Sequence, residues 1–104
     1  MPKTIVTASP VSEAVSRRFF KAIDALCSYK LLSALESFCT LHELSAPRYR
    51  EMRQTYGVTP VAGRVSRYKN IEVEALYYLV ADYPVSASWL LTGRGSMLTK
   101  KITA

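Results

Sequence analysis

The sequence predicts an all-α fold, a compact bundle of four to five helices that contains a helix-turn-helix. Three observations predict it. Apolar residues recur at steps of three and four, helix start and stop signals divide the chain into short segments, and no stretch alternates as a strand does. The chain has 104 residues, which is the size of one domain with one core. We expect this domain to span residues 9–98, between a flexible N-terminal tail at 1–8 and a C-terminal tail at 99–104.

The first helix is predicted to run from Pro10 to about Ser28. Ser9 has the place of an N-cap, and proline is tolerated in the first turn that follows it. The inward face consists of apolar residues spaced by four, four and three positions, which are Val15, Phe19, Ile23 and Leu26.

A short second helix is predicted from a capping box, in which Ser33 caps the helix and Glu36 reaches back. We expect its inward residues to be Leu35, Phe38 and Cys39, with His42 as a further candidate. The signal Ser45-Ala46-Pro47 then starts a third helix that runs to about Tyr56. Gly57 is predicted to end that helix in a left-handed conformation.

The second half of the chain is predicted to hold a loop and two further helices. Residues 57–69 contain two glycines and a proline without a helical period, so we expect a loop or irregular ribbon beside the third helix. Asn70 is predicted to cap a fourth helix, Ile71 to about Asp82. Its buried stripe is predicted to comprise Val73, Leu76 and Val80, with Tyr77 as a further candidate. Ser86 is predicted to cap a last short helix, Ala87–Leu91, which Thr92-Gly93 stops.

The positive charge is concentrated in the middle of the chain. The net charge is +6, and residues 48–69 hold six Lys or Arg against Glu51 alone, which is +5. Residues 1–47 contribute +1 and residues 70–104 contribute nothing. A local basic block on a folded chain favours a polyanionic partner, because binding releases the counterions of phosphates. The alternative is a solvated basic surface that aids solubility.

The third predicted helix has the composition of a helix that enters the major groove of DNA. Tyr49, Met52 and Tyr56 can form its inner face, which leaves polar and cationic side chains outward. The residues predicted to contact bases are Arg48, Arg50, Arg53 and Gln54. Those predicted to contact the DNA backbone are Ser45, Arg64, Arg67, Tyr68 and Lys69. This hypothesis requires that side chains 48–54 protrude together, since guanidinium groups held inward by carboxylates would contradict it. The alternative reading is a solvated helix face over a plain core.

Residues 33–56 resemble the helix-turn-helix of bacterial and phage repressors of the Cro-like class, and the likeness extends over roughly residues 30–98. The stretch 83–98, Tyr-Pro-Val-Ser-Ala-Ser-Trp-Leu-Leu-Thr-Gly-Arg-Gly-Ser-Met-Leu, is similar to the ending of many small regulators of that class. The resemblance implies a lambda-repressor-like fold whose third helix reads double-stranded DNA. His42 and Glu43 depart from it, because the class usually has an apolar residue and then glycine at the turn. We therefore expect a strained, re-shaped or longer turn.

The combined prediction is a sequence-specific regulator of transcription that binds double-stranded DNA, acts as a homodimer and is cytoplasmic. The longest apolar run, Ala75–Ala81, is too short to span a membrane. We expect no enzymatic activity and no cofactor, because no nucleophile–base pair is visible. A metal site of His42, Cys27 and Cys39 is disfavoured by their spacing. The alternative function is a helical protein-interaction module, antitoxin-like or a phage accessory protein, with a seam at Tyr77, Tyr78, Trp89 and Met97.

Overall fold

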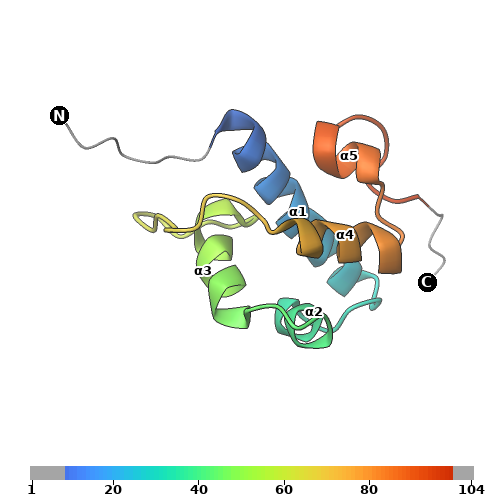
Figure 1. The fold of residues 1–104 in the computed structure, drawn as a ribbon, viewed down its shortest axis with the longest axis horizontal. Coiled ribbons are helices and arrows are strands. Elements are labelled where there is room, and N and C mark those ends of the chain that lie inside the picture. Colours follow the sequence, from blue (N-terminus) through green and yellow to red (C-terminus); the bar gives the residue numbers. More distant parts are fainter. Residues whose placement is uncertain (1–8, 100–104) are drawn as a thin grey trace.

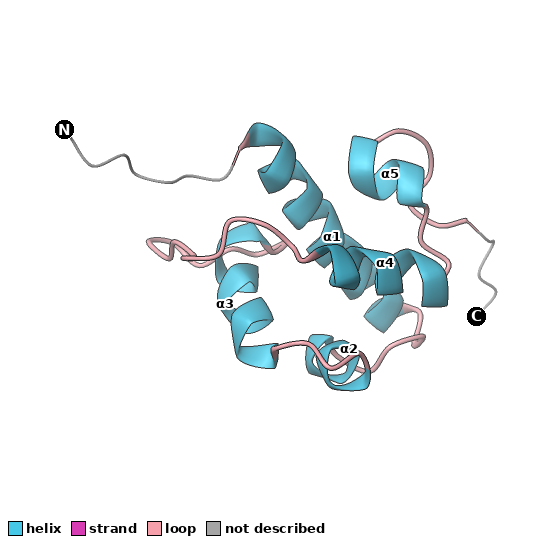
Figure 2. Cartoon of the chain, viewed as in Figure 1, coloured by secondary structure: helices cyan, strands magenta, loops and turns pink. Residues whose placement is uncertain are grey.

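The computed structural model describes residues 9–99, and these residues form an all-helical domain (Figures 1 and 2). The helices are α1 (Pro10–Ser28), α2 (Leu35–Leu41), α3 (Ala46–Tyr56), α4 (Val73–Asp82) and α5 (Ala87–Thr92). Within the described range, the β pairing is limited to one isolated bridge between Val85 and Leu98. The predicted all-α class is thus confirmed. The tail predicted at 1–8 and residues 100–104 of the tail predicted at 99–104 lie outside the described residues, whereas Thr99 of that second tail donates its amide to the carbonyl of Pro84.

One core joins the five helices. Its largest fully buried side chains come from α1, α2, α3 and α4 and from the segment around α5, and they include Phe19, Phe20, Ile23, Leu26, Phe38, Tyr49, Met52, Leu79, Val85 and Leu90. The ring centre of Phe19 on α1 lies 5.8 Å from those of Phe38 on α2 and Tyr49 on α3, so Phe19 connects the three helices in the core. The inward residues predicted for these three helices are therefore confirmed, except that Val15 is only half-buried.

Three of the five predicted helix starts are confirmed by their caps. The hydroxyls of Ser9, Ser45 and Ser86 accept from the amides of Ser12, Arg48 and Trp89 at 3.0, 3.3 and 3.2 Å. Each of these bonds satisfies one of the amides that a helix leaves free at its start. Gly93 ends α5 with a φ of +77°, as predicted.

The other two starts differ from the prediction. Ala34, and not Ser33, is the N-cap of α2, and its start has no side-chain cap. The Ser33 hydroxyl is instead bonded to that of Ser37. Glu36 turns toward Arg50 of α3, so the capping box does not form. Helix α4 starts at Val73 with Glu72 as N-cap, and the carbonyl of Asn70 accepts from Arg48.

The conformation of Gly57 and the buried face of α4 also differ from the prediction. Gly57 follows α3 in an extended conformation, with a φ of −71°. A Cβ at this position would meet the carbonyl oxygen of Arg53, so the glycine is required by space and not by handedness. Ala75 and Leu79 are the fully buried residues of α4. Of the predicted stripe, Leu76 and Val80 are partly buried against the core, whereas Val73 and Tyr77 are exposed.

Candidate nucleic-acid interface

The predicted turn between α2 and α3 consists of residues 42–45. Glu43 adopts a φ of +56° there, in the left-handed region that favours glycine. The amide of Leu44 closes the end of α2 by donating to the carbonyl of Cys39 at 2.7 Å. The expected strain is thus confirmed, and the turn forms without glycine.

His42 connects this turn to α4. Its ring is stacked on that of Tyr78, with centroids 4.4 Å apart, and its Nδ1 lies 3.8 Å from a carboxylate oxygen of Asp82. The hydroxyl of Tyr83 lies 3.5 Å from its Nε2. Only 7% of the side chain is exposed. His42 is therefore a packing residue that fixes the turn against the C-terminal half of α4.

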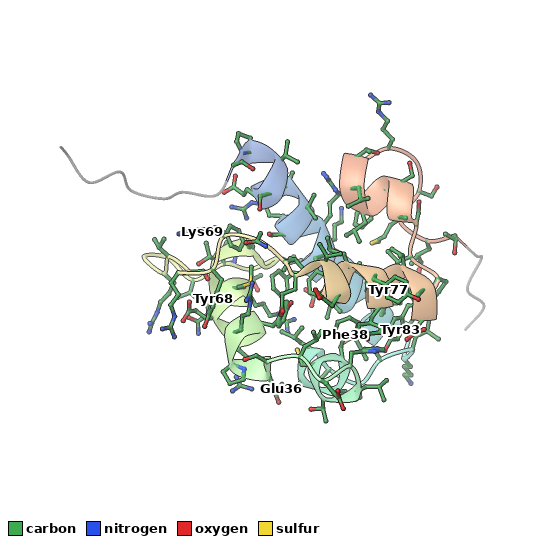
Figure 3. All side chains as sticks on the ribbon, viewed as in Figure 1. Glu36, Phe38, Tyr68, Lys69, Tyr77 and Tyr83 are labelled. Atoms are coloured by element: carbon green, nitrogen blue, oxygen red, sulfur yellow. The ribbon has the colours of Figure 1, made fainter. Side chains whose placement is uncertain are left out.

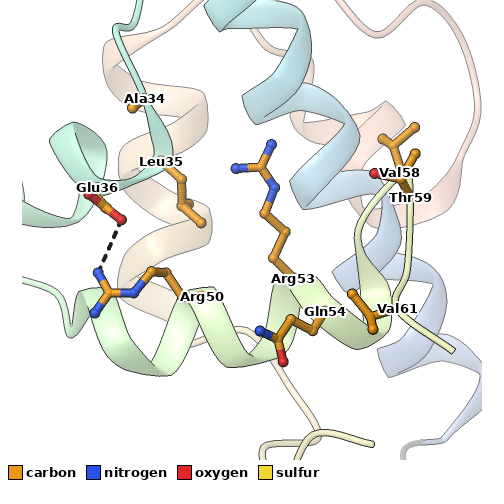
Figure 4. Close-up of a pocket in the computed structure, with 9 residues that line it drawn as sticks. All are labelled: Ala34, Leu35, Glu36, Arg50, Arg53, Gln54, Val58, Thr59 and Val61. Atoms are coloured by element: carbon orange, nitrogen blue, oxygen red, sulfur yellow. Dashed lines mark hydrogen bonds and ion pairs between the residues drawn. The ribbon is translucent and has the colours of Figure 1, made fainter. Parts of the chain in front are cut away.

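An open pocket of about 430 Å³ lies between the start of α2, the side of α3 and the segment after α3 (Figure 4). Arg50, Arg53 and Gln54 line it from α3, and Val58 and Val61 line it from the other side. The structure therefore brings three of the four predicted base-contacting residues to one hollow of the surface.

Two of these cationic side chains already have carboxylate partners. Nη1 of Arg50 lies 3.2 Å from Oε1 of Glu36, and both side chains are more than half exposed. Arg53 pairs closely with Asp24 of α1, in a less exposed position. Of the three α3 side chains that line this pocket, only Gln54 has no carboxylate partner among the described residues. Arg53 is thus held to α1 by a carboxylate, contrary to the requirement that side chains 48–54 protrude together, whereas Arg50 and Gln54 remain on the exposed side of α3.

Arg48, the fourth predicted base-contacting residue, folds toward the loop before α4. Its Nη2 donates to the carbonyl of Asn70 at 3.1 Å, and its guanidinium lies 4.6 Å from the ring centre of Tyr68. Its Nε lies 4.0 Å from Glu72, too far for a hydrogen bond, and is buried without a partner among the described residues. Glu72 also accepts from the hydroxyl of Tyr49, and burial together with this bond raises the pKa of Tyr49 well above its ordinary value. Arg48 thereby links α3 to the start of α4.

Residues 57–69 form the predicted irregular ribbon, which extends from the end of α3 (Figure 1). Glu51 holds it to the helix. Its carboxylate accepts from the amide of Arg67 at 3.1 Å, from Nε of Arg67 at 3.2 Å and from the hydroxyl of Ser66 at 3.3 Å. These bonds, led by the one from the Arg67 amide, lower the pKa of Glu51. Thr55 adds a second attachment, because its hydroxyl accepts from Ser66 and donates to the carbonyl of Arg64.

The predicted backbone-contacting residues divide into two groups. Arg64 and Arg67 are exposed on the ribbon, and 77% of the Arg67 side chain is accessible. Tyr68 is half-buried beneath the guanidiniums of Arg48 and Arg67, and Nζ of Lys69 donates to the carbonyl of Ser66 at 2.6 Å. Figure 3 labels Tyr68 and Lys69 on this ribbon, away from Tyr77 on α4. The hydroxyl of Ser45 is occupied by its capping bond.

Sequence reasoning missed the acidic partners of this surface. Glu36, Asp24 and Glu51 each contact an arginine of the basic segment. Glu51 carried a signal, because it is the single acid among six basic residues in 48–69. Glu36 and Asp24 carried none, since they lie 14 and 29 positions away from their partners.

The structure also bears on the alternative interaction seam and on the metal hypothesis. Tyr77 is exposed and lines an apolar groove of about 340 Å³ between α4 and α5, but Trp89 is buried and Tyr78 is stacked on His42. Among residues 9–99, no three His, Cys, Asp or Glu side chains gather closely enough to hold a metal ion. Cys27 and Cys39 are both free thiols.

Comparisons with known proteins add no identification. Neither a protein-family model, nor a curated protein, nor a solved structure matches the chain. Across the described part of the chain, none of the helices is both long enough and apolar enough to cross a bilayer.

Proposed function

We propose that the chain is a sequence-specific DNA-binding regulator of transcription, with α3 entering the major groove and the ribbon 57–69 lying along the phosphate backbone. The observation that carries the proposal is that the two basic parts of the chain, α3 and the ribbon 57–69, are held side by side. Glu51 and Thr55 attach the ribbon to α3, so the charges of Arg64 and Arg67 stay beside those of the helix. A fixed cationic ridge of this kind suits a polyanion with regular charge spacing.

The helix order supports duplex DNA over other polyanions. Helices α2 and α3 are joined by residues 42–45, a connection of the length found in helix-turn-helix proteins. Arg50 and Gln54 lie on the exposed side of α3, and these residue types can pair with guanine and adenine in the major groove. The resemblance to Cro-like repressors points the same way. Because one short helix gives limited specificity, the proposed active form is a homodimer on a two-fold site.

The ion pairs of Arg50 and Arg53 do not exclude this function. Exposed pairs contribute about 0–1 kcal/mol, which the phosphates of a duplex can replace. Arg50 is the more exposed of the two and exchanges its partner more readily. Arg53 and Arg48 reach bases only after leaving Asp24 and the Asn70 carbonyl, so we expect Arg50 and Gln54 to make the first base contacts.

The test begins with selection of bound sequences from a random duplex library, followed by mobility-shift titrations of the selected site at several salt concentrations. Arg50→Ala is expected to cost about 1–3 kcal/mol on the selected site and to relax its sequence preference. Arg67→Ala is expected to weaken all sequences alike and to reduce the salt slope by about one.

Arg94→Ala is the matched control, because Arg94 is exposed after α5 and outside the basic segment. It removes the same charge and is expected to leave the sequence preference unchanged. No binding at low salt, or binding without preference for any sequence, would refute the regulator proposal.

A second candidate is the protein-interaction module. The groove between α4 and α5 favours it, since Val73, Tyr77 and Leu91 line the groove and are largely exposed. Failure to bind any duplex at low salt, together with self-association that Tyr77→Glu abolishes in sedimentation equilibrium, would favour this function over DNA binding.

A further inference from the structure

The ion pair between Glu36 and Arg50 sits at the mouth of the pocket on α3 (Figure 4). It joins the first turn of α2 to the exposed side of α3 at 3.2 Å. The Glu36 side chain is 61% exposed and that of Arg50 is 51% exposed. A ligand that approaches α3 through this pocket therefore meets a carboxylate beside the guanidinium that it must use.

The three acidic residues of this surface are not equivalent. Glu51 accepts three hydrogen bonds and attaches the ribbon to α3, so its loss changes the shape of the surface. Asp24 holds Arg53 against α1 in the less exposed pair and braces two helices of the core. Glu36 accepts one hydrogen bond within the described residues, from the half-exposed side chain of Arg50. It is the acid whose partner is easiest to exchange.

We propose that Glu36 is a specificity-determining residue that competes with DNA phosphates for Arg50. Its carboxylate acts as an internal stand-in for a phosphate, so a duplex must displace it before Arg50 is engaged. A random sequence offers Arg50 a phosphate of similar charge and gains little from this exchange. A preferred sequence offers two acceptors in the plane of a guanine, which the guanidinium fork matches better than a single carboxylate oxygen. Glu36 thereby weakens generic binding more than specific binding; this inference rests on the proposed function.

The test compares Glu36→Gln with Glu13→Gln. Both variants remove one negative charge, and Glu13 pairs with Arg17 in a similarly exposed ion pair on α1, at 3.4 Å. In mobility shifts with a random-sequence duplex, we expect Glu36→Gln to bind about two- to fivefold more tightly at low salt. Its salt slope should steepen by about one, because a freed Arg50 neutralises one more phosphate. Glu13→Gln should leave both quantities close to those of the wild type.

The third variant places Glu36→Gln in an Arg50→Ala background, where the gain should vanish because the competing guanidinium is gone. A gain that persists there, or one that Glu13→Gln reproduces, overturns the proposal and leaves the DNA-binding function intact. If neither the wild type nor Glu36→Gln binds duplex at low salt, the proposed function and this inference both fail. Thermal unfolding of the exposed-site variants within a few degrees of the wild type verifies that the fold is kept.

Discussion

Arg18→Ala is expected to release α5 from α1. Nε of Arg18 donates to the carbonyl of Leu90 at 2.8 Å, in a partly buried position, and its Nη2 donates to that of Leu91 at 3.1 Å. These carbonyls belong to the last turn of α5, where a helix leaves its acceptors free and where a cation is favourable. The Arg18 side chain on α1 therefore supplies hydrogen-bond donors for two carbonyl groups at the end of α5.

The magnitude follows from the two bonds. A hydrogen bond from a charged donor contributes roughly 1.5–3 kcal/mol, and an exposed one contributes less. We therefore expect a loss of about 2 kcal/mol in the free energy of unfolding. For a domain of this size, about 1 kcal/mol corresponds to roughly 4–8 °C, so Tm should fall by roughly 10 °C.

The assay is thermal unfolding followed by circular dichroism, with urea unfolding as a second measure of the free energy. Arg17→Ala is the matched control, because it removes the same charge one position away. Arg17 pairs with Glu13 on the surface and lies 5.9 Å from the ring centre of Tyr56, so its loss should cost under ~1 kcal/mol. Equal destabilisation by the two variants would refute the reasoning that Arg18 anchors α5.

Three further predictions concern α3, the thiols and the ribbon. Gly57→Ala should destabilise the protein by about 1–3 kcal/mol in urea unfolding, because its Cβ would press on the backbone of Arg53. Gly63→Ala, with a φ of +80° and open space around it, should cost only about 1 kcal/mol, and the reverse order would contradict the steric explanation. Burial raises the pKa of Cys39 to about 11, so iodoacetamide at pH 8 should modify Cys39 more slowly than Cys27 in the native protein. In urea the two thiols should react equally fast. Faster labelling of Cys39 than of Cys27 in the native protein would be inconsistent with the burial of Cys39. Since the Arg67 amide lowers the pKa of Glu51, the attachment of the ribbon should be complete above about pH 4.3 and be lost as pH falls through the lower native pKa. The chemical shift of the Arg67 amide should follow this titration in NMR spectra. If the same pH-dependent shift persists in Glu51→Gln, a group other than Glu51 causes it.

Helix starts were the most predictable part of the fold. The caps at Ser9, Ser45 and Ser86 depend on residues three positions apart, so their signal is contained in the local sequence. The predicted caps at Ser33 and Asn70 do not form. The Ser33 hydroxyl is bonded to that of Ser37, Glu36 is bonded to Arg50, and the Asn70 side chain donates to the carbonyl of Ile71.

The buried side of α4 was not predictable from its composition. The segment is apolar on most of its circumference, and the predicted stripe comprised Val73, Leu76 and Val80, with Tyr77 as a further candidate. The structure fully buries Ala75 and Leu79, leaves Leu76 and Val80 partly buried against the core, and leaves Tyr77 62% exposed. Ala75 is fully buried although its side chain is small, because burial depends on how closely the helices pack. A pattern of hydrophobicity does not encode the distance between helices.

The basic segment was predictable, but its electrostatic state was not. Charge counting located the excess at residues 48–69, and the ribbon beside α3 followed from its glycines and proline. The carboxylates of Glu36, Asp24 and Glu51 reach this segment through tertiary contacts, across 14, 29 and 16 positions of sequence. These partners decide which arginines are ready to meet a ligand.

The bond between Arg18 and Leu90 closes the domain across 72 positions of the chain. At a translation rate of ~5–20 residues per second, the ribosome needs roughly 4–14 s to synthesise the acceptor after the donor. During that interval the guanidinium stays hydrated, and the N-terminal helix can bury its apolar face only against segments already made. The nascent polypeptide thus acquires this contact only after Leu90 has been made, so premature termination before Leu90 would leave a fragment without it.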